Sequence, residues 1–373
     1  MKMVNSYEIT DIKRLEGTRL KNATLRTRMG CSRNISKSIE RTTDLKTLSR
    51  IGSGDVINEC YIDLTLDKLR EIDSDRHAQE TYINSRAKFL ERGYLNVFIV
   101  KLGIGGGQKL EQMDYEYLNN LLGWSMNSIY VMPTLEFDSS IPRELHIPLY
   151  DDFIDNMLKV KKEWYLDKIN YGAMIPSFYP QRRVGSLLDR YDINASESMF
   201  IAVDFNNSRI DSRPGDVVNK IHAYLDEKNA EKTFLYGVNV KPYKKGETVA
   251  SALDIHSVHL SFNAMGPTHS KPRKAIIVAN DWASAGKIYQ HEDYSYHRLD
   301  EIPVRDDFID WAEKSYGEEL HADFTKNKKS PYSSIKRYNF EHANKELFKI
   351  SDAIKKNDKD AIKSLFENKP DGL

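Results

Sequence analysis

Several carboxylates stand directly after apolar stretches, at points where a buried strand is expected to end. Asp204 is the clearest, because the apolar run before it would otherwise bury a charge without a partner. A carboxylate in this position can act as a general base, as a nucleophile or as a hydrogen-bond acceptor for a ligand. It can equally cap the next helix or anchor a loop, so both interpretations stay open. The polar residues at or near expected strand ends are Glu136, Asp138, Asp204, Asn206, Asn207, Asn239, Asp254, His256 and His259.

The histidines and cysteines do not form a recognisable metal motif. His256 and His259 are three residues apart in an expected strand, so they fall on opposite faces and are badly placed to bind one ion. His269 and His291 belong to no compact ligand set. The chain has 2 cysteines, too few for a disulfide framework or a cysteine-rich zinc site. We therefore expect no metal and no cofactor.

A cluster of glycines, Gly103-Ile104-Gly105-Gly106-Gly107, follows the apolar run Asn96–Leu102. It lacks the lysine of a P-loop and the spacing of the dinucleotide fingerprint, so it predicts neither kind of phosphate site. Glycines at this point let the backbone approach a flat ligand closely, or they form a simple turn. The sequence does not decide between these two roles.

Apolar runs and helical spacing alternate along most of the chain, which is typical of consecutive βα units. The sequence predicts an α/β protein with a single (β/α)8 barrel of the TIM type, with extra C-terminal helices packed outside it. The carboxyl ends of the strands would then meet on one open face, where such barrels carry their sites. Strands are expected over 96–102, 128–132, 171–175, 198–204, 233–238, 255–262 and 275–279. Helices are expected over 113–122, 153–166, 184–191, 214–228, 308–316, 341–357 and 361–366.

The chain divides by charge as well as by pattern. Residues 1–95 would hold a basic N-terminal segment and the first barrel elements, 96–300 the main barrel, and 301–373 a helical extension. The formal net charge is zero, so no global field attracts nucleic acid. Between residues 13 and 50, however, basic residues far outnumber acids, as either a solvated surface or a phosphate-contacting strip. With no apolar leader and no membrane-spanning run, the expected location is cytoplasmic and no membrane partner is expected.

The order of these segments resembles the tRNA-guanine transglycosylase family, including its branch that inserts 7-deazaguanine into DNA. The resemblance runs from Asn96 to Asn357, and each of its motifs is degenerate. Gly103–Gln108 is similar to the family's Asp-Ser-Gly-Gly-Phe-Gln strand end, and the closing helix from Tyr338 to Ile354 is similar to the family helix that begins His-Asn. The remaining similar segments are Ser128–Glu136, Tyr171–Pro176, Phe234–Asn239 and Ala252–Ser257.

The departures from the family bear on activity. In this register the family's nucleophilic aspartate falls on Ser257 and its general acid/base aspartate falls near Gly103, and the zinc motif is absent. The resemblance then implies that Asp254 is the nucleophile candidate, Asp204 the acid/base candidate and Glu136 the group that accepts hydrogen bonds from a guanine-like base. Phe137, Phe205 and Tyr236 are candidates for stacking on that base. The full candidate site is Asp254, Asp204 and Ser257 for catalysis, and Glu136, Asn206, Gly105, Gly106, Tyr236 and His256 for base binding.

Three functions remain open from the sequence. The first is a diverged transglycosylase-like protein that exchanges or recognises a guanine or 7-deazaguanine base in tRNA or DNA. The second is a non-catalytic relative of these enzymes that serves as a binding or partner subunit, in a homo- or hetero-oligomer. The third is an unrelated barrel enzyme for a small molecule, with a divalent metal held by Glu136, Asp204 and a histidine.

Overall fold

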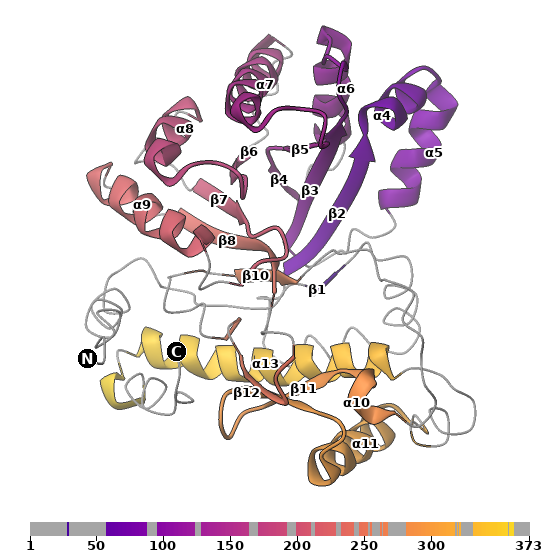
Figure 1. Cartoon of the computed structure of the whole chain (residues 1–373), viewed down its shortest axis with the longest axis vertical. Helices are drawn as coiled ribbons and strands as arrows, with labels where there is room; N and C mark the ends of the chain where they lie inside the picture. Colours follow the sequence, from indigo (N-terminus) through magenta and orange to yellow (C-terminus); the bar gives the residue numbers. More distant parts are fainter. Residues whose placement is uncertain are drawn as a thin grey trace.

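The computed structural model describes a parallel sheet wrapped by helices and a smaller antiparallel unit (Figure 1). The described residues are 28–29, 57–87, 95–123, 128–163, 171–191, 199–209, 213–228, 233–241, 246–252, 254–255, 262, 264–267, 281–317, 319, 321, 331–356 and 358–361. The basic segment at 13–50, except for 28–29, and the residues Ser257, His256, His259 and His269 lie outside this set.

The parallel sheet has its strands in the same order as the chain. β4 and β5 both pair with β3, β4 along its first half and β5 along its second, so they are two parts of one interrupted strand. The outermost strands, β1 and β10, contact each other, so the two edges of the sheet approach one another. The strands are β1 (Arg28–Met29), β2 (Ile57–Thr65), β3 (Leu95–Ile104), β4 (Ser128–Val131), β5 (Thr134–Phe137), β6 (Tyr171–Ile175), β7 (Met199–Asp204), β8 (Thr233–Val240) and β10 (Ala264–Pro267).

Helices follow most of these strands and lie around the outside of the sheet (Figure 1). α4 begins directly after β2, where the Thr65 hydroxyl accepts a hydrogen bond from the Lys68 N–H at 3.2 Å and so caps the helix. The apolar faces of the helices and one face of the sheet form the main core. The helices are α4 (Leu66–Asp73), α5 (Arg76–Ala87), α6 (Gln112–Gly123), α7 (Arg143–Glu163), α8 (Val184–Arg190) and α9 (Arg213–Glu227), with a short 3-10 helix, η2 (Gln181–Arg183), before α8.

On the other face of the sheet, aromatic rings of β7 and β8 pack against each other. Neighbours in register share a face, and Phe200 stacks on Phe234 of the next strand with ring centroids 5.2 Å apart. Gly172 lies opposite this pair, where a Cβ would come within 2.8 Å of Phe200. Only glycine leaves enough room for that ring at this position. The inner face is therefore closely packed at this level.

A separate antiparallel unit contains the C-terminal helices. Its sheet has the order β11 (Lys287–Gln290), β12 (Ser295–Arg298), β9 (Val249–Ser251). α13 (Tyr332–Lys355) packs against it: Asn339 accepts a hydrogen bond from the Tyr289 N–H at 2.7 Å and donates one to the Lys287 carbonyl at 2.9 Å. α10 (Trp282–Ala285) and α11 (Ile302–Tyr316) lie on the side of α13 away from the parallel sheet (Figure 1).

Most of the elements predicted over 96–240 are confirmed, with shifted ends. α7 begins ten residues before the predicted helix, because Pro148 and the polar residues around it do not interrupt it. The strand predicted over 255–262 is wrong at its start, since Asp254 and Ile255 form a turn. The short strand β10 lies just after this range and was not predicted. The strand predicted over 275–279 lies outside the described residues. The antiparallel sheet was not predicted at all.

Among the described residues, no helix combines the length and apolarity needed to cross a membrane.

Candidate functional site

Asp204 is the best-positioned of the predicted carboxylates. It is the last residue of β7 and is buried. Its Oδ1 accepts two hydrogen bonds, from the Asn206 N–H at 2.8 Å and from the side-chain amide of Asn239 at 3.0 Å. Two donors on one oxygen fix the carboxylate in orientation, as a group that must act on a ligand requires.

The backbone around Asp204 has an unusual conformation. Asn206, Asn207 and Asn239 have positive φ angles of 42°, 65° and 55°, and Tyr294 is the only other non-glycine residue of this kind within the described segments. Asparagine tolerates the left-handed region better than most residues, at some energetic cost. The Asn207 N–H donates to the Asn239 carbonyl at 2.9 Å and so ties the loop after β7 to the end of β8. The surrounding structure thus holds this arrangement against its intrinsic strain.

Tyr61 on β2 joins the same group of residues. The Asn239 amide also contacts the Tyr61 hydroxyl, at 3.4 Å. Burial raises the pKa of Tyr61 well above its usual value, and the nearby carboxylates of Asp204 and Asp63 raise it further, while the bond from Asn239 acts in the opposite direction. Tyr61 therefore remains a neutral phenol, which can donate a hydrogen bond but does not serve as a base at ordinary pH.

Glu136 on β5 forms an ion pair with Lys101 on β3. The Lys101 Nζ lies 2.7 Å from the Glu136 Oε1, and the two side chains are 17% and 52% exposed. In the sheet register Lys101 pairs with Asp63 on one side and Thr134 on the other, while Gly103 pairs with Glu136. Residues in register share a face, so the ion pair lies on the same face as Asp63 and, two positions earlier on β2, Tyr61.

These contacts form two polar groups, Asp204–Asn239–Tyr61 and Lys101–Glu136, whose members come from five strands, β2, β3, β5, β7 and β8. We call Tyr61, Lys101, Glu136, Asp204 and Asn239 the strand-end cluster. It contains two carboxylates, one ammonium, one phenol and one amide. Such a set can accept hydrogen bonds from a ligand and donate to it from the same side, and its carboxylates can also attack an electrophilic carbon or transfer a proton.

The glycine cluster has a structural role in the present geometry. The Gly105 N–H donates to the Gln108 side-chain carbonyl at 2.7 Å, and the Gly106 N–H donates to Asp138 at 3.2 Å. A Cβ on Gly106 would lie 2.1 Å from the Ser140 Oγ. The close approach of this loop to the loop after β5 therefore requires a residue without a side chain at position 106. Hydrogen bonds from the Ser140 side chain and backbone lower the pKa of Asp138. Gly105 and Gly106 were predicted to bind a base, and in the structure their N–H groups donate to Gln108 and Asp138.

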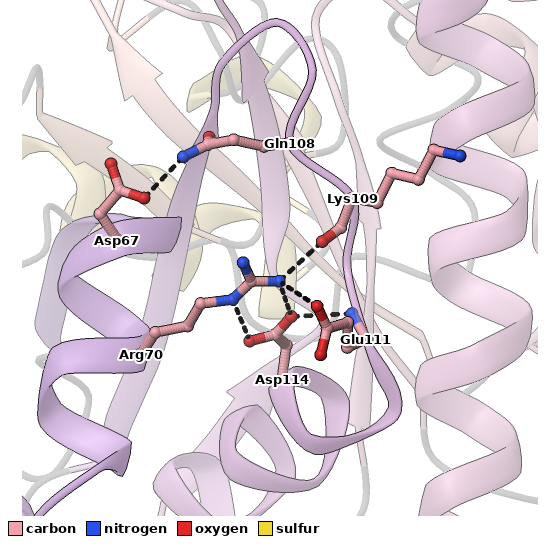
Figure 2. A network of polar contacts seen from close by, with 6 residues as sticks. All are labelled: Asp67, Arg70, Gln108, Lys109, Glu111 and Asp114. Carbon is pink, nitrogen blue, oxygen red and sulfur yellow. Dashed lines mark hydrogen bonds and ion pairs between the residues drawn. The ribbon is translucent and has the colours of Figure 1, made fainter.

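The same loop is anchored to α4 by the network in Figure 2. The Arg70 guanidinium donates two hydrogen bonds to the Asp114 carboxylate, at 3.1 and 2.8 Å, and one to the Lys109 carbonyl at 2.7 Å. Gln108 donates to Asp67 at 2.7 Å. The Lys109 ammonium points away from the network (Figure 2). These bonds fix the loop between β3 and α6, and with it the end of the strand that carries Lys101.

Asp254 lies in a different environment from the strand-end cluster. It follows β9, is buried, and accepts a hydrogen bond from the Tyr296 hydroxyl on β12 at 2.8 Å and one from the Ile255 N–H at 3.1 Å. The donors of both bonds lie in or beside the antiparallel unit. The donors described for Asp204 are Asn206 and Asn239, at the ends of β7 and β8. The structure therefore does not bring the nucleophile candidate and the acid/base candidate together through these contacts.

The predicted aromatic residues differ in how available they are. Tyr236 is buried and donates a hydrogen bond to Glu59, and Phe205 is buried edge-on against Phe262 at 5.6 Å. Phe137 is half-buried and stacks on His146 with centroids 4.4 Å apart. Of the three rings, Phe137 alone is partly exposed. The predicted residues Ser257 and His256 lie outside the described part of the chain, as do His259 and His269, and His291 is exposed beside Glu292 at 3.2 Å.

Tyr61 and Lys101 were not predicted from the sequence, although each left a signal. In β2 the residues alternate between buried apolar side chains and the series Glu59, Tyr61, Asp63, which is the pattern of a strand with a polar inner face. Lys101 is a single charge inside an otherwise apolar run. Within the described segments no three His, Cys, Asp or Glu side chains are grouped as metal ligands.

Comparison with known proteins gives no family. No protein-family model matches this sequence, and no curated protein matches it.

Proposed function

We propose that the parallel sheet is a closed (β/α)8 barrel. Counted with β4 and β5 as one interrupted strand, the described residues supply eight parallel strands in sequential order. The contact between β1 and β10 supports closure. So does the hydrogen bond from Tyr236 on β8 to Glu59 on β2, because these strands are not neighbours in the sheet and meet only if it curls around them.

We propose further that this barrel recognises and exchanges a guanine-like base, guanine or a 7-deazaguanine, in a nucleic acid. The observation that carries this is the strand-end cluster, in which the oriented carboxylate of Asp204 is linked through Asn239 and Tyr61 to the strand next to the Lys101–Glu136 pair. Function in barrels of this kind gathers at the carboxyl ends of the strands. The resemblance to the transglycosylases names the reaction class, and it stays a hypothesis.

In this proposal Asp204, rather than Asp254, is the carboxylate that acts on the sugar. Attack of its oxygen on C1′ would break the glycosidic bond, with the bonding electrons leaving on the departing base. The incoming base would then attack C1′ and release the carboxylate. The departing base takes up one proton and the incoming base gives one up, so the exchange is neutral overall. Glu136 would accept hydrogen bonds from the base and hold it in place.

Basic residues in the segments that follow four of the strands, at the same end of the sheet, support a polynucleotide partner. Lys109, Arg143 and Arg182 are exposed, Lys241 is half-buried, and they come from the regions after β3, β5, β6 and β8. None of the four forms an ion pair with a residue that the structure describes. Glu144 is an exposed acid among them. Such a ring would contact phosphates while one base is turned out of the helix into the barrel.

The test is incorporation of radiolabelled guanine and 7-deazaguanine precursors into tRNA and into duplex DNA by the full chain. Asp204→Asn is the test variant, and Asp155→Asn, an exposed carboxylate on α7, is the matched control. We expect label in one nucleic acid, lost in Asp204→Asn and kept in Asp155→Asn. Label that survives in Asp204→Asn would refute the assigned role.

A non-catalytic binding subunit is the second candidate, and one observation favours it. Gly103 stands where the family has its acid/base aspartate, and the carboxylate of Asp254 is bound by Tyr296. Binding of the nucleic acid and the base by a folded chain that incorporates no label, alone or with other subunits added, would select this candidate.

A further inference from the structure

The Lys101–Glu136 ion pair offers a donor and two acceptors side by side. Only one of the three N–H groups of an ammonium is needed for the 2.7 Å contact with the Glu136 Oε1, and the second carboxylate oxygen adds a further acceptor. Glu136 is half exposed, so its outer edge faces solvent. The pair thus presents an ammonium beside one carboxylate oxygen, with the second carboxylate oxygen as a further acceptor.

Guanine carries the complementary sequence of groups on its Watson–Crick edge. Its O6 accepts, and its N1–H and its 2-amino group donate. Adenine presents an amino group where guanine has O6, and it would therefore place a donor against the ammonium. A carboxylate alone accepts hydrogen bonds from N1–H and the 2-amino group but gives O6 no donor.

We propose that Lys101 is a specificity-determining residue that donates a hydrogen bond to O6 of the base, while Glu136 accepts from N1–H and the 2-amino group. This inference rests on the proposed function and deepens it, since it names the ligand class as 6-oxo-2-aminopurines and their 7-deaza forms.

The strand beside the pair carries no side chain at Gly103. Gly103 lies two residues after Lys101 on β3 and pairs in register with Glu136. The nearest atom to a Cβ at Gly103 would be the Leu64 carbonyl oxygen, at 3.8 Å. The protein itself would therefore accept a small side chain here, although the sequence has glycine. The bare strand at Gly103 can thus lie against one edge of the base, as a side chain there would not allow.

The experiment measures binding of three bases to the full chain by equilibrium dialysis. Guanine and 6-thioguanine differ only at position 6, where sulfur is a weak acceptor. Guanine and hypoxanthine differ only in the 2-amino group. The chain is compared with Lys101→Met, with the conservative variant Lys101→Arg, with Glu136→Gln, and with Lys159→Met, an exposed lysine on α7, as a control for loss of a lysine.

We expect guanine to bind about 10-fold more tightly than 6-thioguanine, as one lost contact of this kind costs. Lys101→Met should remove that preference but keep the preference for guanine over hypoxanthine, whereas Glu136→Gln should weaken the latter. Lys101→Arg should retain the preference at position 6, and Lys159→Met should change neither preference. A Lys101→Met variant that still prefers guanine to 6-thioguanine overturns the role of Lys101 alone. Failure of the unaltered chain to bind any of the three bases overturns the proposed function as well.

Discussion

Tyr236 on β8 donates a hydrogen bond to Glu59 on β2, and both side chains are fully buried. The two strands are not neighbours in the sheet. β2 lies next to the edge strand β1, and β8 lies next to the edge strand β10 at the other end. A Cβ on Gly266 of β10 would lie 2.3 Å from the Glu59 carboxylate and 2.9 Å from the Tyr236 hydroxyl. The pair therefore occupies the interior of the sheet below the strand-end cluster, with glycine required where β10 passes it.

Removing the hydroxyl in Tyr236→Phe should lower the free energy of unfolding by about 1–3 kcal/mol, because a buried carboxylate loses a donor. Urea unfolding followed by circular dichroism measures the change. Tyr224→Phe is a suitable control, since that hydroxyl bonds to the exposed Asp189 at 2.7 Å and should matter less. Equal stability of Tyr236→Phe and the unaltered chain would contradict the importance of the pair.

Replacing Gly106 by alanine should also destabilise the protein. The new Cβ would lie 2.1 Å from the Ser140 Oγ and 2.9 Å from the Ser140 Cβ, so the loops after β3 and β5 would have to separate. We expect a loss of about 1–3 kcal/mol, typical of overpacking. Gly103→Ala is the matched control, because its Cβ meets only ordinary contacts. If both variants unfold at the same urea concentration, the close approach of the loops is not what requires glycine.

The Asn239 amide should position Asp204 for its ligand as well as stabilise the fold. Glycine adopts the positive φ of 55° at this position without strain, so the stability lost in Asn239→Gly should be that of one donor to a buried carboxylate, about 1–3 kcal/mol. It removes a donor from Asp204, and we expect weaker guanine binding or slower exchange. Thermal melting and the dialysis assay separate the two effects. Unchanged binding in a folded Asn239→Gly variant would argue against the positioning role.

His342 on α13 should make stability depend on pH. Burial, together with the nearby charges of Lys345 and His291, lowers the pKa of His342 from its usual value of 6.5 to about 4. The unfolded chain then takes up a proton between pH 6.5 and 4 that the folded chain does not, so stability falls as the pH falls through this range. One such proton gives a slope of at most about 1.4 kcal/mol per pH unit.

The variant His342→Phe keeps a ring beside Tyr338, on which His342 stacks at 3.9 Å. Its unfolding free energy should fall less steeply between pH 6.5 and 4 than that of the unaltered chain. The exposed His77 provides the control, since His77→Asn should leave the slope as it is. Parallel pH profiles for His342→Phe and the unaltered chain would contradict the assignment.

The parallel strands were predictable because they are buried on both faces and read as continuous apolar runs, such as Phe200–Val203. The antiparallel strands β9, β11 and β12 were not, because each has only three or four residues, and β11 and β12 mix aromatic with polar side chains. Short strands of this kind lack a period long enough to detect. Their pairing depends on contacts with α13 that lie far along the chain.

The candidate site could be predicted in part. Asp204 and Glu136 were found because a polar residue after an apolar run is visible in the sequence. The same criterion also selected Asp254, since it cannot tell which sheet a residue joins. Lys101 and Tyr61 were missed because they stand within strands. The face to which Lys101 belongs follows only from the strand register, and the contact of Tyr61 with the site follows only from its hydrogen bond with Asn239.

The most direct test of the central claim is a search for a covalent adduct between the chain and end-labelled tRNA or DNA without added base. Denaturing electrophoresis would detect the adduct, and mass spectrometry of its peptides would locate it. The account predicts a slower-migrating species that disappears in Asp204→Asn, with the sugar attached to the peptide that contains Asp204. An adduct on Asp254, or base exchange that continues in Asp204→Asn, would contradict it.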